Sequence, residues 1–332
     1  MTELIQNDTP FIGSERPDSA YQGHSADILS RHGRSFNWAG RVLGAETGKA
    51  AAKLYHLCRI LDDMADGDIT SGPERLACTK RELDRGTAFS DPLLAPFNRF
   101  ISDNHIPRAA LADLLNGLMA DQTQVALSDE AALIRYSYQV AGTVGLMMCP
   151  VLGCHDKNAF AFAVDMGIAM QLTNIARDVL EDAKMGRRYL PASWVGALTP
   201  EDIIAAAHQP AGDTAKNITS GVNQLLKRAD IYYASGRKGL AYLPLRARLA
   251  ISIAAMVYGE IGQKLRRKNL AWHDGRVVTS KAEKITASLA ALSHLKGRRT
   301  GPDSLDLRHD GSLHIGFTLP EFEIKTAGKE GR

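Results

Sequence analysis

Apolar residues recur at steps of three and four positions through most of this chain, and this spacing constrains the fold more than any other feature. Such steps place side chains on one face of an α-helix. The spacing is clear in residues 54–61, 111–118, 163–170 and 251–258. Alternating runs of β-branched residues, which are typical of strands, are nearly absent. The sequence therefore predicts an all-α domain in which helices pack around a shared core.

Glycine, proline and polar residues divide this helical pattern. Breaks are expected near residues 72, 91, 107 and 150, with a longer connection from Gly196 to Asp213. Residues 1–20 are polar and predict a flexible N-terminal arm. Residues 296–332 are rich in Gly, Arg, Asp and Ser and predict a flexible C-terminal tail. A single all-α domain is then expected over residues 21–295.

Composition excludes several classes of protein. Hydrophobic residues make up 45% of 332 residues, and the net charge of +3 is too small to indicate nucleic-acid binding by itself. The longest apolar run, residues 159–176, is interrupted by Asp165, Gln171 and Asn174, so no spanning helix is predicted. We find neither a signal peptide nor a disulfide-type cysteine spacing. These features predict a cytoplasmic location.

Two segments place carboxylates inside apolar helical sequence. Asp62 and Asp66 are one helical turn apart, and Asn174, Asp178 and Asp182 repeat at the same interval. Acids beside a core are unfavourable unless something neutralises them. Oxygen ligands suit Mg²⁺, which typically bridges carboxylates to substrate phosphates. Two such faces on opposite sides of a bundle would hold magnesium and a diphosphate between them.

These segments also allow other interpretations. One acidic pair at this spacing is usually a solvated helix face, but two sets, each with a nearby arginine, favour the metal interpretation. The sequence contains no G-x-G-x-x-G, H-E-x-x-H or G-x-S-x-G motif. Residues 44–50 are similar to a P-loop, but they are one residue short and lack the Ser or Thr after the lysine.

Four segments together resemble the squalene and phytoene synthase family. Residues 58–66 and 171–182 are similar to its two aspartate-rich motifs, and the run Gly186 to Pro191 follows the second as in the family. Residues 136–145 resemble its central tyrosine and glycine helix, and residues 32–36 resemble its first substrate-contacting helix. The resemblance extends from about residue 25 to residue 287. It implies an isoprenoid-synthase-type helical bundle with a central active-site cavity.

The resemblance also implies a reaction. Family members join two allylic diphosphates head to head: one diphosphate departs with the help of Mg²⁺, and the second chain attacks the cation. Proton loss gives a cyclopropylcarbinyl diphosphate, which ionises and rearranges. The resemblance points to a prenyltransferase of carotenoid biosynthesis that converts two geranylgeranyl diphosphates to phytoene, with Mn²⁺ as a substitute metal. NADPH is not expected, because no dinucleotide motif and no apolar C-terminal anchor are found.

The family's functional residues can be carried over onto matching positions. The metal ligands would be Asp62, Asp66, Asn174, Asp178 and Asp182. The substrate-binding residues would be His32, Arg34, Ser35, Tyr55, Arg59, Gln171, Arg177, Tyr258 and Arg276. The catalytic set would be Asp62, Asp66, Asp178, Asp182, Tyr136 and Arg59, with Tyr136 facing the reacting carbons. Gly33 departs from the family, since many relatives have a serine there.

Several alternatives remain open at this point. Tyr136 and Tyr258 could be core tyrosines, and Gly142 and Gly145 are better explained by close helix packing. The substrate could be farnesyl diphosphate, although Gly40, one turn after Phe36, favours a longer chain. A non-catalytic interaction protein would be free to lose the carboxylates, and a terpene cyclase would use one substrate. Basic residues 264–268 suit a solvated helix end or peripheral contact with the inner membrane. Oligomeric state is not predicted.

Overall fold

The computed structural model describes residues 18–21, 25, 29, 34–123, 125–296 and 308–321. Within these ranges every regular element is a helix, and the β pairing there is one isolated bridge between Ala126 and Arg188. The all-α prediction is confirmed. The α-helices are α2 (Arg34–Gly40), α3 (Ala45–Ala65), α4 (Gly72–Asp84), α5 (Asn98–Asp103), α6 (Arg108–Ala120), α7 (Glu130–Ser137), α8 (Thr143–Val151), α9 (Phe160–Lys184), α10 (Ala192–Val195), α11 (Pro200–Ala207), α12 (Asp213–Gly239), α13 (Leu245–Arg267) and α14 (Lys281–Lys296).

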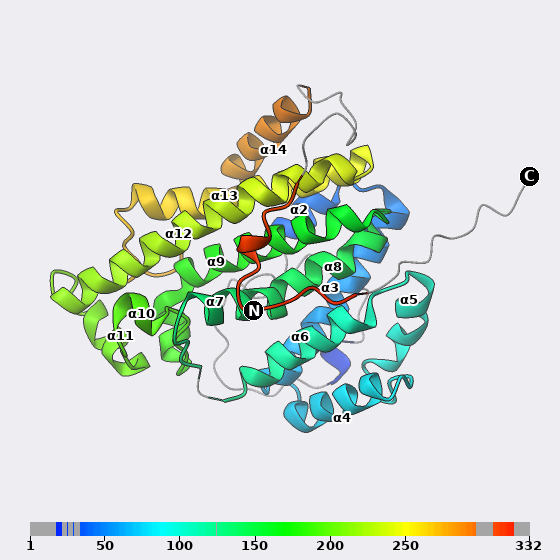
Figure 1. The fold of residues 1–332 in the computed structure, drawn as a ribbon, viewed down its shortest axis with the longest axis horizontal. Coiled ribbons are helices and arrows are strands. Elements are labelled where there is room, and N and C mark those ends of the chain that lie inside the picture. Colours follow the sequence, from blue (N-terminus) through cyan, green and yellow to red (C-terminus); the bar gives the residue numbers. More distant parts are fainter. Residues whose placement is uncertain are drawn as a thin grey trace, which may run out of the picture.

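Helix α9 is the centre of the bundle. It contacts α8, α11, α12 and α13, which surround it in Figure 1. It is buried on nearly all sides, as expected of a helix covered by others. The stretch Lys157–Lys184 is long and apolar enough to cross a membrane, yet 89% of its most apolar window is buried inside the domain. The apolar run seen in the sequence is therefore a core helix here.

Two glycines let α9 lie close to the preceding helices. A Cβ on Gly145 of α8 would lie 2.3 Å from the Ala163 carbonyl oxygen, and one on Gly167 would lie 2.4 Å from that of Ala141. Backbone atoms cannot yield as a flexible side chain can, so larger residues would force the helices apart. The packing interpretation of Gly145 is thereby confirmed.

Two local departures from α-helical geometry occur near the centre of the bundle. A π-helix, η3 (Tyr138–Gly142), joins α7 to α8, and Asp178 of α9 has φ −104° and ψ 15°. A π turn inserts an extra residue into the helix and changes the direction of the side chains that follow it. The two departures fall within residues 136–145 and 171–182, which are two of the four segments that resemble the family.

One helix occurs where the sequence predicts a connection. Helix α11 lies within residues 196–213, and Thr199 and Asp202 form a capping box at its start. Its eight residues are too few for apolar periodicity to be recognised, so the connection predicted from Gly196 to Asp213 contains a helix that the spacing did not reveal.

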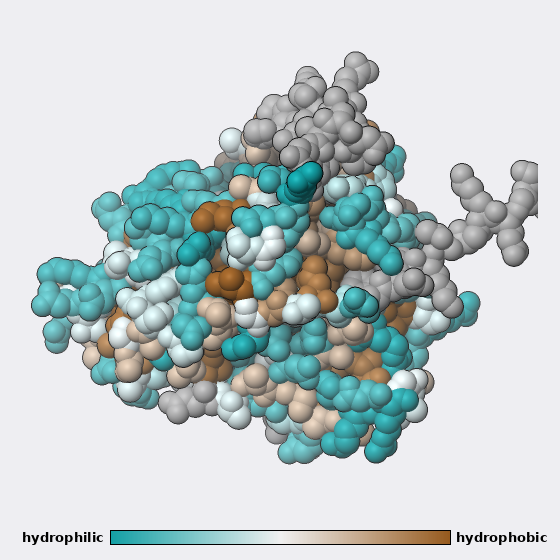
Figure 2. Space-filling view, in the orientation of Figure 1, coloured by the Kyte–Doolittle hydropathy of each residue, from teal (hydrophilic) through white to brown (hydrophobic). Residues whose placement is uncertain are grey.

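Residues 308–321 fall in the segment for which a flexible tail is predicted, and they pack against the domain. The Tyr232 hydroxyl of α12 donates a hydrogen bond to the Leu313 carbonyl oxygen, and Phe317 stacks on Tyr138 with ring centroids 4.1 Å apart. In Figure 1 this red segment crosses in front of the central helices. The same face in Figure 2 is largely hydrophilic, with small separate hydrophobic areas near its centre.

Candidate active site

The first carboxylate face lies at the end of α3, where Asp62 is buried among apolar neighbours and Asp66 is exposed. Asp62 is 3% exposed, and Arg59 Nη1 lies 3.4 Å from its Oδ2 atom. The same arginine donates from Nε to Asp63 at 3.0 Å, and the Tyr21 hydroxyl donates to Asp63 at 2.6 Å. Burial, followed by the charge of Asp66, raises the pKa of Asp62 well above its usual range. Arg59 is thus shared by two acids, and its charge does not offset both.

The second carboxylate face lies on α9, where Asp178 and Asp182 are both buried. Arg177 donates from Nε to Asp178 at 2.7 Å, and Arg276 Nε lies 3.2 Å from the same carboxylate. Asp178 therefore faces two guanidinium groups. Burial, followed by the charge of Asp178, raises the pKa of Asp182 well above its usual range. The two faces are alike in this respect. Asp63 and Asp178 have close arginine partners, whereas the raised pKa values of Asp62 and Asp182 favour their neutral forms.

An ion pair joins the two faces. Arg187, just after α9, places Nη2 2.6 Å from the Asp66 carboxylate. Asp66, Asp121 and Arg187 line one hollow beside the ends of α3 and α9. Arg187 and Asp121 were not among the predicted site residues. The run Gly186 to Pro191 after the second motif was the signal for Arg187, whereas the sequence carried none for Asp121.

Tyr136 lies beside this hollow. Its hydroxyl donates to Asp121 at 2.8 Å, and its ring stacks on Tyr189 with centroids 4.8 Å apart. Burial raises the pKa of Tyr136, so the phenol stays protonated. Tyr136 is not among the described residues that line the apolar cavity, so a position facing the reacting carbons stays a prediction.

Two buried amides on α9 are the clearest sign of a binding site. Gln171 and Asn174 are both fully buried, and neither amide group has a hydrogen-bond partner among the described residues. A buried amide without a partner costs roughly 1 to 3 kcal/mol, so such groups usually meet a ligand, ion or water. Asn174 is one turn from Asp178, as the predicted ligand set requires.

This donor set fits a magnesium ion. The predicted ligands offer only oxygen atoms, which Mg²⁺ prefers, and the Asn174 amide oxygen has no partner within the described part of the chain. Asp62 and Asp182 have raised pKa values because nearby cations do not compensate for burial and like charge. A bound divalent cation would supply the missing positive charge.

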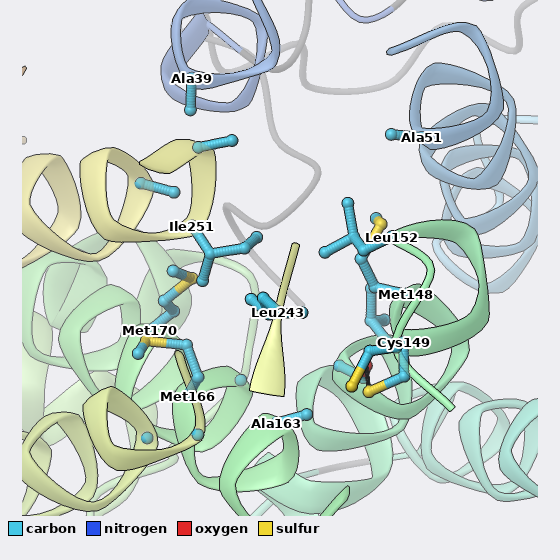
Figure 3. A pocket seen from close by; sticks show the side chains of 18 of the residues that line it. Ala39, Ala51, Met148, Cys149, Leu152, Ala163, Met166, Met170, Leu243 and Ile251 are labelled. Carbon is cyan, nitrogen blue, oxygen red and sulfur yellow. Dashed lines mark hydrogen bonds between the residues drawn. The ribbon is translucent and has the colours of Figure 1, made fainter. Parts of the chain in front are cut away.

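An apolar cavity begins one helical turn below the polar groups. Tyr55 and Cys58 of α3 line it, and on α9 Met170, one turn before Asn174, also does. Figure 3 shows Met166, Met170 and Ile251 on one side and Met148, Cys149 and Leu152 on the other. Gly40 also lines the cavity, as the sequence predicts. The site therefore joins a polar, anionic head to an apolar chamber.

The remaining predicted residues differ in what the structure describes. Tyr258 of α13 is buried, and burial raises the pKa of its phenol. Arg34 and Ser35 are the first two residues of α2, which also carries Gly40. His32 lies outside the described residues.

A helical bundle with an apolar chamber and two carboxylate faces at its polar end defines a class of prenyl-diphosphate enzymes. The squalene/phytoene synthase family matches residues 29–283, and the chain belongs to that family. It is 35% identical to a 15-cis-phytoene synthase from Pantoea ananas over 284 residues, 81% of this chain and 90% of that protein. It is 36% identical to a phytoene synthase from Thermus thermophilus over 249 residues, 72% of this chain and 81% of that protein.

Solved structures confirm the predicted fold. A dehydrosqualene synthase crystallised with a ligand superposes with a TM-score of 0.70 at 26% identity, covering 85% of this chain and 97% of that one. A squalene synthase from Alicyclobacillus acidocaldarius superposes with a TM-score of 0.62 at 20% identity, covering 74% and 94%. The second likeness concerns the fold alone.

Proposed function

We propose that this protein is a prenyltransferase that condenses two geranylgeranyl diphosphates head to head into 15-cis-phytoene and releases diphosphate. The observation that carries the proposal is the apolar cavity lined by Met170, which is adjacent in sequence to Gln171 and one helical turn before Asn174, whose buried amides have no partner among the described residues. The names of the curated relatives support phytoene as the product. Phytoene formation belongs to carotenoid biosynthesis.

The predicted site residues have different chemical roles. Asp62, Asp66, Asn174, Asp178 and Asp182 would hold Mg²⁺, and the bound ion would supply positive charge to neutralise the charge that develops on the leaving diphosphate.

Guanidinium groups on both faces add positive charge at the polar end. Arg59 and Arg177 present planar forks that suit phosphate oxygens and can orient the leaving group. The cavity beneath them is lined by apolar side chains and keeps water from an allylic cation. The amide of Gln171, one helical turn before Asn174, is available to orient the substrate.

The length of the substrate is set by the depth of the cavity. A Cβ added at Gly40 would have no heavy atom of the described residues within 4 Å, so this position leaves open space among them. Open space on the wall supports a C20 substrate over a C15 one. We expect Gly40→Phe to lower activity with geranylgeranyl diphosphate at least tenfold more than activity with farnesyl diphosphate, since a ring would fill this space. Gly259→Phe is the matched control, because its added Cβ also meets open space and it does not line the cavity.

A product this apolar must leave into a lipid phase, which supports a cytoplasmic enzyme in peripheral contact with the inner membrane. Leu245 at the start of α13 is 70% exposed, and Leu289 of α14 is 62% exposed. Co-sedimentation with anionic vesicles tests this contact, and recovery of all protein in the supernatant would refute it.

A product assay tests the proposed reaction. Purified protein with Mg²⁺ receives geranylgeranyl or farnesyl diphosphate, each with and without NADPH, and the extract is analysed by mass spectrometry. We expect a C40 hydrocarbon with a conjugated triene without NADPH. A C30 product alone would move the substrate to farnesyl diphosphate. Absence of any hydrocarbon from either substrate would refute the catalytic assignment and favour an interaction protein.

A further inference from the structure

A second polar cluster lies on α9, six residues before Gln171, and does not line the cavity. Asp165 is fully buried and accepts a hydrogen bond from Ser235 of α12 at 2.5 Å. Its two carboxylate oxygens also lie 2.8 Å from His309 Nε2 and 2.9 Å from His314 Nε2. Both histidines belong to residues 308–321, so a core helix and a segment distant in sequence meet at one carboxylate.

The turn between the histidines holds them on the same side. The 3-10 turn η7 (Gly311–Leu313) separates them, and Asp310 caps it by accepting from the Ser312 backbone N–H at 3.0 Å. The two imidazole rings lie 4.4 Å apart with both Nε2 atoms aimed at Asp165. The spacing H-x₄-H is within the range used by paired histidines in structural zinc sites. The turn therefore positions both imidazole rings toward Asp165.

The donor chemistry differs from that of the acidic faces. Two imidazole nitrogens and a carboxylate oxygen, all within 4.8 Å of one another, suit Zn²⁺ and its neighbours among the late divalent metals. Mg²⁺ prefers oxygen ligands alone. Around a tetrahedral zinc, nitrogen and oxygen ligands lie about 3.4 Å apart, so the imidazoles would have to move outward by about half an ångström. Their side chains are 15% and 11% exposed, which leaves room for that movement and for water as a fourth ligand.

We propose that Asp165, His309 and His314 form a zinc site that ties residues 308–321 to α9. The His309 ring meets Phe162 edge-on with centroids 5.3 Å apart, and Phe162 lines the apolar cavity. The ion would hold the segment against the outer side of the cavity wall. This site shares no residue with the predicted magnesium ligands, so its test is independent of the proposed reaction.

Zinc binding to the full chain tests the site. Protein stripped with a chelator is titrated with ZnCl₂ in excess Mg²⁺, followed by calorimetry and by metal analysis after dialysis. We expect one zinc per chain in the wild type and an affinity at least tenfold lower in His309→Gln and in His314→Gln. His155→Gln is the matched control, because His155 is exposed and outside the cluster, and it should bind zinc as the wild type does.

The variants separate this site from zinc bound elsewhere. Equal zinc uptake by the wild type and both histidine variants would overturn the proposal, as would no uptake by the wild type. In that case the three side chains form a hydrogen-bonded cluster and no more. The histidines are partly exposed and their rings lie at the surface of the domain, so circular dichroism should show both variants folded. A zinc-dependent rise in melting temperature that the variants lose provides a second measure.

Discussion

The two carboxylate faces of the site, one on α3 and one on α9, use arginine differently. On α3, one guanidinium group serves Asp62 and Asp63 together, and Asp63 also receives the Tyr21 hydroxyl. On α9, two guanidinium groups converge on Asp178. In each face an acid with close cationic partners lies near one whose pKa is raised, Asp62 in the first and Asp182 in the second. We infer from this difference that Asp63 supports the fold, and we propose that Asp62 and Asp182 bind a cation.

The largest effect is expected from Asp62→Asn. The change removes the carboxylate proposed to bind metal but keeps the shape of the side chain, so turnover should fall by about 10²- to 10³-fold. Stability should stay nearly level, because burial already favours the neutral form of Asp62. Product formation and thermal unfolding measure the two effects. Near-normal turnover with Mg²⁺ would show that Asp62 is not a ligand.

The neighbouring variant Asp63→Asn should reverse this pattern. It removes the main anionic partner of Arg59 and leaves a buried guanidinium group poorly compensated. Breaking a buried pair in this way costs roughly 3 to 5 kcal/mol. Chemical denaturation should show the loss, with Asp62→Asn as the matched control. If both variants lost the same stability, the distinction between a structural and a functional acid on α3 would fail.

Arg187→Gln tests whether the ion pair between the faces matters to catalysis. The pair is partly exposed, with 15% of the Arg187 side chain and 23% of the Asp66 side chain accessible. Its contribution to stability should therefore be below about 1 kcal/mol. We expect a fall in turnover of about tenfold, because Arg187 adds positive charge beside the hollow between the faces. Arg267→Gln, on an exposed pair with Glu260, should leave turnover unchanged.

The smallest effect concerns pH and again separates the two helices. Helix α3 carries His56, which is 5% exposed, whereas α9 contains no histidine. Burial lowers the pKa of His56 to about 4, below the value of about 6.5 expected in the unfolded chain. As the pH falls, the unfolded state therefore takes up the proton first. The contribution of neutral His56 to the stability of the fold is full above about pH 6.5 and is lost as the pH falls toward 4. His56→Phe should reduce the drop in melting temperature between pH 7 and pH 5. An unchanged drop would contradict this account.

Sequence reasoning was most successful where structure is local. The spacing of apolar residues predicted the helices that carry the site, and the i, i+4 spacing placed Asn174, Asp178 and Asp182 along one side of α9. The short helix α11 was missed because eight residues give too little periodicity. The resemblance of residues 136–145 to a family helix gave no sign that Tyr138–Gly142 would form a π turn.

The sequence by itself determined the all-α class, the two acidic segments and the family, because backbone hydrogen bonds fix helical spacing within a few residues. Only the tertiary structure decided which side chains distant in the sequence become partners. The pair of Asp66 and Arg187 joins residues 121 positions apart, and His309 reaches Asp165 across 144 positions. Arg59 and Arg177 meet acids within four positions on their own helices, whereas these two distant contacts depend on how whole helices pack and follow from no spacing along the chain.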